Sequence, residues 1–299
     1  MGILEEVGVG PHRVEAGLLL RTAILHSSLL YTAEAWSNLS LKEIKRLEQV
    51  DLHLLKLLLG GHSKSSNIFY HLETGTLMIR HILTINRMMF HQHILTRKED
   101  ETIKKIYMKQ QTEYVKGDWY QLLLEDFKFV GKDMDEEAIK QTPKETYRIK
   151  VKKMVSKAAF KMYTENQNCL SKIRNLKYEQ LCLQEYLKSD MFSTDERKLL
   201  VRLRSKCHNS KANFKQLHKN QTNCILGCTE NEDQEHVFIK CKEIKTKHNI
   251  PYKYLFETKV KQKQAIRVFL KIDLERQQDI EALPPGEDTA RTHAVRSSS

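Results

Sequence analysis

The sequence predicts a mainly helical protein, in which a multi-helix bundle is followed by a basic helical region and a small zinc-stapled segment. Five prolines and eleven glycines are few for 299 residues, whereas Leu, Lys, Glu, Ile and Gln are plentiful, and this balance favours helices. Apolar residues also recur at helical spacing along most of the chain. With 40% hydrophobic and 29% charged residues, the composition is that of a globular protein rather than a disordered one.

Start and stop signals divide the first 117 residues into helices. Ser40 and Glu43 form a capping box, which predicts a helix start at this point. Gly60, Gly75 and Gly117 each follow an apolar periodic stretch and predict its end. After a loose lead-in over 1–14, the predicted helices are 15–31, 44–59, 67–73, 77–95 and 101–116.

Similar signals divide the remainder of the chain. Ser193 and Glu196 form a second capping box, Pro251 opens the last helix, and Cys182 belongs to the apolar stripe of one predicted helix. The predicted helices are 118–127, 146–163, 171–187, 194–206 and 251–274. The predicted regions are a lead-in (1–14), a helical domain (15–117), a basic helical region (118–212), a zinc segment (213–246), an amphipathic helix (247–275) and a disordered tail (276–299).

The most informative motif places three cysteines and one histidine within eighteen residues. Cys224, Cys228, His236 and Cys241 follow the spacing C-x3-C-x7-H-x4-C, and Gly227 allows a tight turn before the second thiol. Zinc prefers four tetrahedral sulfur and nitrogen ligands on short spacers. A closed set of four predicts a structural ion, because a catalytic zinc keeps one position for water. In the alternative interpretation the cysteines are small buried hydrophobes and the histidine is a surface residue.

The charge of the chain predicts a polyanionic partner, either RNA or DNA. The net charge is +12 and the isoelectric point about 9.3. Between Lys140 and Lys177 there are eleven basic residues and only two acidic ones. A solvated helix face is the alternative explanation of this run. The candidate phosphate contacts are Arg148, Lys150, Lys152, Lys153, Lys157 and Lys161.

Other functions lack a sequence signal. No signal peptide opens the chain and no apolar run approaches the ~20 residues of a membrane span, so we expect an intracellular protein of the nucleus or cytoplasm. His81, His91 and His93 lack the i, i+4 spacing of helical metal ligands and are interpreted as packing or surface residues. Nucleophile-elbow and phosphate-loop motifs are absent, and we expect neither an enzyme nor a small-molecule substrate.

Three segments in order resemble the region after the palm in non-LTR (LINE-type) retrotransposon reverse transcriptases. Residues 29–36 (LLYTAEAW) are similar to the segment that opens the thumb, with Thr32 in place of the usual glycine. The helix over 44–59, the turn over 69–75 (FYHLETG) and the helix over 78–95 are similar to the helical thumb. Residues 203–206 (LRSK), Asn213-Phe214 and the Cys/His motif together resemble the C-terminal zinc-knuckle-type segment, with a longer first spacer than is usual.

This resemblance implies a thumb-like domain over 15–117 that binds an RNA–DNA template-primer, and a zinc segment that holds RNA or target DNA. We expect no polymerase activity, because the two-metal reaction needs clustered carboxylates and the chain contains no Asp-Asp pair and no palm upstream of the thumb. The expected molecule is therefore a truncated, nucleic-acid-binding fragment. A zinc-stabilised protein-interaction scaffold and a non-functional relic remain as alternatives.

Overall fold

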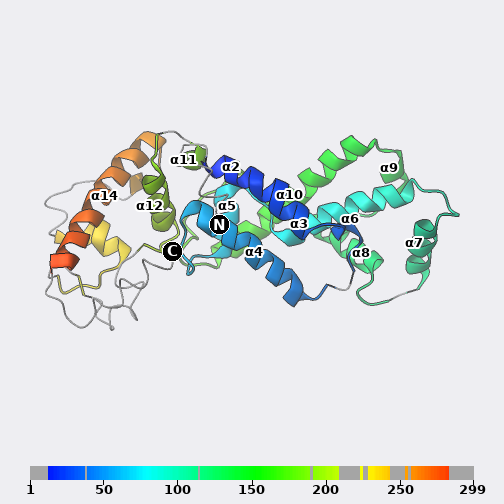
Figure 1. Ribbon diagram of the computed structural model, residues 1–299, viewed down its shortest axis with the longest axis horizontal. Coiled ribbons are helices and arrows are strands. Elements are labelled where there is room, and N and C mark those ends of the chain that lie inside the picture. Colours follow the sequence, from blue (N-terminus) through cyan, green and yellow to red (C-terminus); the bar gives the residue numbers. More distant parts are fainter. Residues whose placement is uncertain are drawn as a thin grey trace. The chain divides into compact units, whose positions relative to one another are not determined.

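The computed structural model describes residues 13–37, 39–113, 115–188, 191–208, 223–224, 228–242, 253–254 and 257–282. Over these residues the protein is mainly helical, as predicted, and its only extended pairings are two isolated bridges (Figure 1). None of the described helices combines the length and apolarity needed to cross a bilayer. The chain divides into two compact units, Met1–Asp190 and Met191–Ser299, and this boundary lies inside the predicted basic region 118–212.

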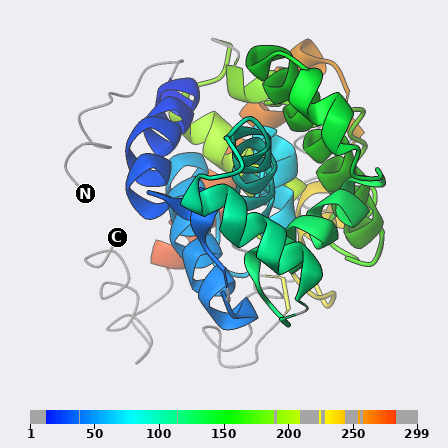
Figure 2. The ribbon, with the colours of Figure 1, turned by 90° about the vertical axis from the view of Figure 1, so that its right-hand side faces the viewer.

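Helix α6 is the centre of the first unit. It contacts α4, α7, α8, α9 and α10, and its residues contribute to the apolar core that Met88 and Leu95 share with Val151 and Val155 of α10. Seen from the side, α2 and α4 lie to the left and α10 to the right (Figure 2). The elements are α2 (Arg13–Leu20), η1 (Arg21–His26), α3 (Ser27–Leu29), η2 (Ala33–Ala35), α4 (Leu41–Leu59), α5 (Asn67–Thr74), α6 (Ile79–Leu95), α7 (Thr102–Thr112), α8 (Trp119–Val130), α9 (Glu136–Gln141), α10 (Lys144–Asn168) and α11 (Glu185–Lys188).

The capping box and the terminal glycine predicted for α4 are confirmed, and the helix begins at Leu41, three residues before the predicted 44–59. The Ser40 side chain accepts a hydrogen bond from the Glu43 backbone N–H, and the Glu43 carboxylate accepts one from the Ser40 N–H. These reciprocal bonds hold the pKa of Glu43 below its usual value. At the other end Gly60 adopts the left-handed conformation, with φ 62°, and closes the helix.

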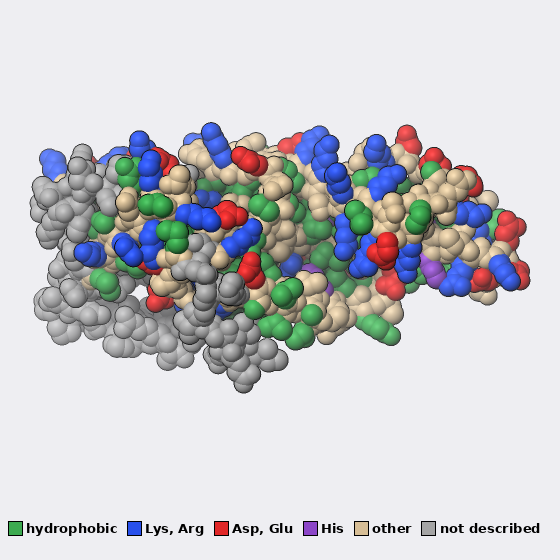
Figure 3. All heavy atoms as spheres, turned by 90° about the horizontal axis from the view of Figure 1, so that it is seen from above, with side chains coloured by type: hydrophobic (Ala, Val, Ile, Leu, Met, Phe, Trp, Pro, Cys, Tyr) green, Lys and Arg blue, Asp and Glu red, His purple; other side chains and the backbone are tan. Residues whose placement is uncertain are grey.

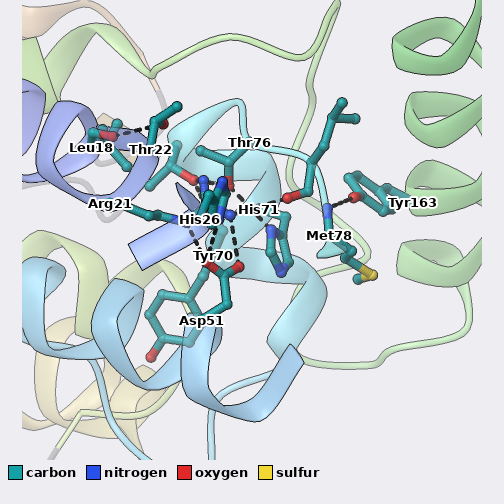
Figure 4. Close-up of polar contacts among 12 residues, drawn as sticks. Leu18, Arg21, Thr22, His26, Asp51, Tyr70, His71, Thr76, Met78 and Tyr163 are labelled. Carbon is teal, nitrogen blue, oxygen red and sulfur yellow. Dashed lines mark hydrogen bonds and ion pairs between the residues drawn. The ribbon is translucent and has the colours of Figure 1, made fainter. Parts of the chain in front are cut away.

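A buried ion pair joins the N-terminal helical segment to α4. Arg21, in the π-helical segment η1, donates from Nε and Nη2 to the two carboxylate oxygens of Asp51, each over 2.6 Å (Figure 4). His26 Nε2 donates to the same carboxylate over 2.9 Å. Burial by itself would raise the pKa of Asp51, but the hydrogen bonds from His26 and Arg21 and the arginine charge hold that pKa below its usual value. Asp51 is therefore a buried carboxylate whose charge is fully compensated.

The helix predicted over 171–187 is wrong. This segment forms turns and bends, and only Glu185–Lys188 is helical. The Gln167 amide donates to the backbone oxygens of Ile173 and Leu176, and Gln184 N–H donates to Glu73 O, so tertiary partners satisfy the backbone instead of a helix. Cys182 accordingly lies in a bend beside α5 and not on a helical stripe.

Gly75 is the position where this segment meets the end of α5. Its φ is +67°, and an added Cβ would lie 2.4 Å from both the carbonyl carbon and the Cα of Cys182. We expect Gly75→Ala to destabilise the first unit by roughly 2–5 kcal/mol, from left-handed strain plus overpacking. Gly131→Ala is the matched control: φ is +66° but nothing lies within 4 Å, so only the strain of about 1–2 kcal/mol applies. Urea unfolding of both variants measures the difference, and equal losses would contradict the packing argument.

The second unit contains α12 (Thr194–Arg204), the π-helical turn η4 (His236–Lys240) and α14 (Lys259–Ala282). The second predicted capping box, Ser193 with Glu196, is confirmed at the start of α12. The final helix begins and ends later than the predicted 251–274, and it extends into the predicted tail 276–299 as far as Ala282. Residues 283–299, like most of the predicted lead-in 1–14, lie outside the described residues.

Candidate metal centre

The four residues of the Cys/His motif come together in the second unit. One ligand atom from each of Cys224, Cys228, His236 and Cys241 lies within 4.8 Å of all the others. The Cys241 sulfur is 3.6 Å from that of Cys228 and 4.0 Å from that of Cys224. Sulfurs bound tetrahedrally at ~2.3 Å from a zinc ion would be ~3.8 Å apart. This Cys3His group could hold a metal ion, and among the described residues no other group of three or more His, Cys, Asp and Glu side chains could do so.

A short turn positions the first two cysteines. Asn223 pairs with Asn231 in an antiparallel bridge, and Cys224 N–H donates to Glu230 O over 3.0 Å. These contacts hold Cys224 next to the segment that begins at Cys228, and the sulfurs of both cysteines lie within 4.8 Å of the other ligand atoms. Gly227, which the sequence analysis assigned to this turn, lies outside the described residues.

A π-helical turn positions the other two ligands. An α-helix rotates ~100° per residue, so side chains five residues apart would point ~140° away from each other. The π-type bond from Cys241 N–H to His236 O, 2.8 Å long, widens the turn and brings both side chains to the cluster. Asp233 starts the turn by accepting the His236 N–H over 2.6 Å. The x4 spacing thus corresponds to a specific backbone conformation.

The hydrogen bonds of His236 also fit a metal ligand. The ring is buried, its Nδ1 lies 3.0 Å from a carboxylate oxygen of Glu230, and its Nε2 is buried with no hydrogen-bond partner. A histidine that binds a metal through one nitrogen usually donates the other N–H to a carboxylate, which fixes the tautomer. Glu230 was missed in the sequence analysis, because a glutamate between two ligands has no motif of its own.

Among the three thiols of the cluster, the pKa of Cys228 is perturbed. The pKa of Cys228 is raised by loss of hydration and by the neighbouring Cys241 thiol. A bound cation would reverse this effect, because metals take cysteines as thiolates.

Aromatic packing connects the cluster to the helices of the second unit. Phe238, in the π-helical turn, packs against Phe269 of α14 with ring centroids 4.5 Å apart and the rings tilted by 55°, and it meets His208 edge-on at 5.2 Å. The Gln234 amide donates to Leu203 O at the end of α12 over 2.8 Å. Loss of the cluster would therefore remove packing from α12 and α14.

The predicted phosphate contacts lie in the first unit, on α10. This helix buries one stripe of residues and exposes the basic side chains around it. Lys150, Lys153, Lys157 and Lys161 are spaced by three, four and four residues, so they follow one line along the outer face; we call these four residues the lysine ridge. Arg148 and Lys152 lie on the flank of this line. The buried stripe comprises Tyr147, Val151, Val155, Ala159, Tyr163 and Gln167.

Few carboxylates neutralise this face. Arg148 lies 3.7 Å from Glu145 and Lys161 lies 3.9 Å from Glu165, both as exposed pairs. Within the described part of the chain Lys150, Lys153 and Lys157 have no acidic partner. On the face that Figure 3 shows, Lys and Arg side chains lie among Asp and Glu side chains.

The histidines of α6 lie away from the Cys/His motif in the sequence and pack in the first unit. His81 and His91 are buried, and burial lowers the pKa of each to about 4, so both rings are neutral at physiological pH. His93 is exposed. These positions agree with their interpretation as packing and surface residues.

Comparison with known proteins adds no family assignment, because no family model, curated protein or solved structure matches this chain.

Proposed function

We propose that the protein binds the phosphate backbone of RNA or DNA through the lysine ridge, and that the Cys3His group holds a structural zinc ion. The lysine ridge is the observation that carries the first part. Four lysines in line along one exposed helix face, three of them without an acidic partner, present the pattern that neutralises successive phosphates. Because α10 buries its opposite face against α6, the ridge is held on a rigid support.

The ligand chemistry supports zinc as the metal. Thiolates and imidazole select zinc over magnesium or calcium, and four protein ligands leave no open position for catalysis. The sulfur distances and the orphaned Nε2 of His236 fit this assignment. Zinc would stabilise the second unit and would not itself attract phosphate, because three thiolates outweigh its charge.

We further propose that the chain corresponds to the thumb and C-terminal region of a LINE-type reverse transcriptase. The order of α4, α5 and α6, with Gly60 and Gly75 at the helix ends, supports this assignment, together with the Cys/His cluster further along the chain. In this proposal the helical first unit contacts template-primer or element RNA and performs no chemistry.

Binding of 20-nucleotide RNA and DNA probes, followed by fluorescence anisotropy from 50 to 300 mM salt, tests the lysine ridge. Replacing its four lysines with Gln should lower the slope of log K against log salt by about 3, at roughly 0.7–0.9 per phosphate contact. A control with the same charge change replaces Lys42, Lys98, Lys105 and Lys132, all exposed, with Gln.

Equal slopes in the two quadruple variants would contradict a role for the ridge. Affinity that is indifferent to salt would instead favour the protein-interaction scaffold. The surface that would serve such a scaffold is an apolar groove of about 550 Å³ beside α4, lined by Trp36, Leu39, Leu47 and Val50 among others.

A further inference from the structure

A second cavity in the first unit is lined by a histidine whose side chain is almost wholly buried. The cavity has a volume of about 430 Å³ and is lined by α4, the start of α5 and the start of α6. This volume lies within the range of small-molecule sites, roughly 300–1,000 Å³. His71 of α5 lines the cavity and is only 3% exposed.

A chain of hydrogen bonds fixes the tautomer of His71. The Thr74 hydroxyl donates to Tyr70 O over 2.6 Å, so Thr74 Oγ1 is free to accept from the Thr76 hydroxyl, 2.9 Å away. With its proton used in this way, Thr76 Oγ1 accepts the Nδ1–H of His71 over 3.1 Å. The other ring nitrogen, Nε2, therefore carries a lone pair and no proton. Figure 4 shows one nitrogen of this ring toward Thr76 and the other directed away from it.

The lone pair on Nε2 persists at physiological pH. Burial lowers the pKa of His71 to about 3, so the ring does not take up a second proton. Among the described residues Nε2 has no hydrogen-bond partner. A ligand that contacts this nitrogen must therefore offer an N–H or O–H donor.

The start of α5 offers hydrogen-bond donors and a nearby positive charge, in contrast to the acceptor nitrogen of His71. Ser66 is the N-cap of this helix but makes no side-chain capping bond, and Ser66, Asn67 and Ile68 line the cavity. Uncapped N–H groups at a helix start bind anions. Lys45, exposed on α4, adds a cation that has no acidic partner in the described chain.

The remaining charges of the cavity cancel, and its walls are apolar. Arg80 donates to both oxygens of Glu48, over 2.6 and 2.7 Å, so this pair leaves no net charge. Leu52, Ile68 and Met78 supply apolar surface. The cavity thus combines an anion-binding site at the start of α5, apolar walls, and the acceptor nitrogen Nε2 of His71.

We propose that this cavity binds one nucleotide, with the phosphate at the start of α5 near Lys45 and a base N–H donating to Nε2 of His71. Nucleotides combine an anionic group, a flat apolar ring and edge N–H donors, which are the three properties that the cavity matches. The nucleotide is either free or an unpaired nucleotide of a bound strand. The inference goes beyond backbone binding by the lysine ridge, and it departs from the expectation that no small molecule binds.

Nuclear magnetic resonance of the full chain with 15N-labelled histidine tests the acceptor directly. We expect His71 as the Nδ1–H tautomer, and a shift of its Nε2 resonance when AMP or UMP is added. An Nε2 resonance that stays unchanged with both nucleotides at saturation would overturn the proposal, as would an Nε2–H tautomer.

Matched ligands test the donor without altering the protein. Calorimetry should show that AMP binds roughly 10- to 100-fold more tightly than purine riboside 5′-monophosphate, which lacks the amino group, or that UMP binds more tightly than its N3-methyl analogue by a similar factor. The reason is that a ligand without the donor leaves the acceptor nitrogen of His71 unpaired in the complex, which costs binding free energy. Equal affinities within both pairs would contradict the base contact. These comparisons remain decisive even if His71→Phe, which removes the acceptor, does not fold.

Substitutions of two lysines of α4 test where the phosphate binds. Lys45→Ala should weaken AMP binding about 2- to 5-fold, the effect of one exposed cation, whereas Lys42→Ala, also exposed on α4 but outside the cavity, should not. Equal effects would contradict the phosphate position. A single-stranded trinucleotide distinguishes a nucleotide of a bound strand from a free nucleotide. If it shifts the Nε2 resonance of His71 and binds more tightly than AMP, the natural ligand is a strand. If it binds more weakly than AMP, the natural ligand is a free nucleotide. The quadruple lysine-ridge variant should bind AMP as tightly as the natural protein, because the ridge lies outside the cavity. The experiments therefore distinguish failure of the cavity proposal from failure of the lysine-ridge proposal.

Discussion

Replacing Cys241 with Ser should abolish metal binding and unfold the segment around 223–242. Cys241 is 1% exposed and its sulfur is close to those of both other cysteines. Structural zinc contributes about 10–16 kcal/mol of apparent binding free energy, which is comparable to the total stability of an ordinary domain, about 5–15 kcal/mol. Loss of one of four ligands therefore removes most of what holds this segment together.

Elemental analysis of protein purified without chelator should give one zinc per chain, and none for Cys241→Ser. Hydrogen exchange should show lost protection in 228–242 and in α12 and α14, which pack against Phe238 and Gln234. The first unit, with a core of its own, should keep its protection.

Cys169→Ser is the matched control, because this cysteine is exposed and lies in the first unit. It should retain the metal and the protection pattern. A chain that carries no zinc, or a Cys241→Ser variant as protected as the natural protein, would show that the cluster is not a metal site.

Asp51→Asn should destabilise the first unit strongly, because it leaves the Arg21 charge buried without its counterion. Arg21 and Asp51 are 3% and 1% exposed. Breaking a buried ion pair from one side costs about 3–5 kcal/mol. For a unit of this size we expect Tm to fall by roughly 6–20 °C, at about 2–4 °C per kcal/mol.

The double variant Arg21→Met with Asp51→Leu separates charge burial from packing. It should recover part of the lost stability, because no charge is left buried without its counterion, while His26 Nε2 loses its acceptor as it does in any variant without Asp51. Lys109→Ala is a surface control: its pair with Glu113, 3.7 Å apart with side chains 69% and 62% exposed, should leave Tm unchanged. Calorimetry measures all three, and a double variant no more stable than Asp51→Asn would argue against the electrostatic explanation.

Local sequence signals predicted several helix boundaries correctly. Both capping boxes and the glycines that end α4 and α5 appear as predicted, because capping depends on residues three or four positions apart. The failed helix over 171–187 shows the limit of this reasoning. Its apolar periodicity is real, but the Gln167 side chain at the end of α10 and the backbone of Glu73, more than 100 residues away, provide its backbone partners.

The sequence by itself determined the helical class, the four residues of the Cys/His cluster and the basic character of α10, because composition, ligand spacing and charge are properties of the local chain. Only the tertiary structure decided that Glu230 orients His236, and that His71 presents a bare nitrogen to a cavity. The physical reason is that a hydrogen-bond partner or a cavity wall is selected by distance in space. Residues that are far apart in the sequence come within hydrogen-bonding distance only once the chain has folded and packed.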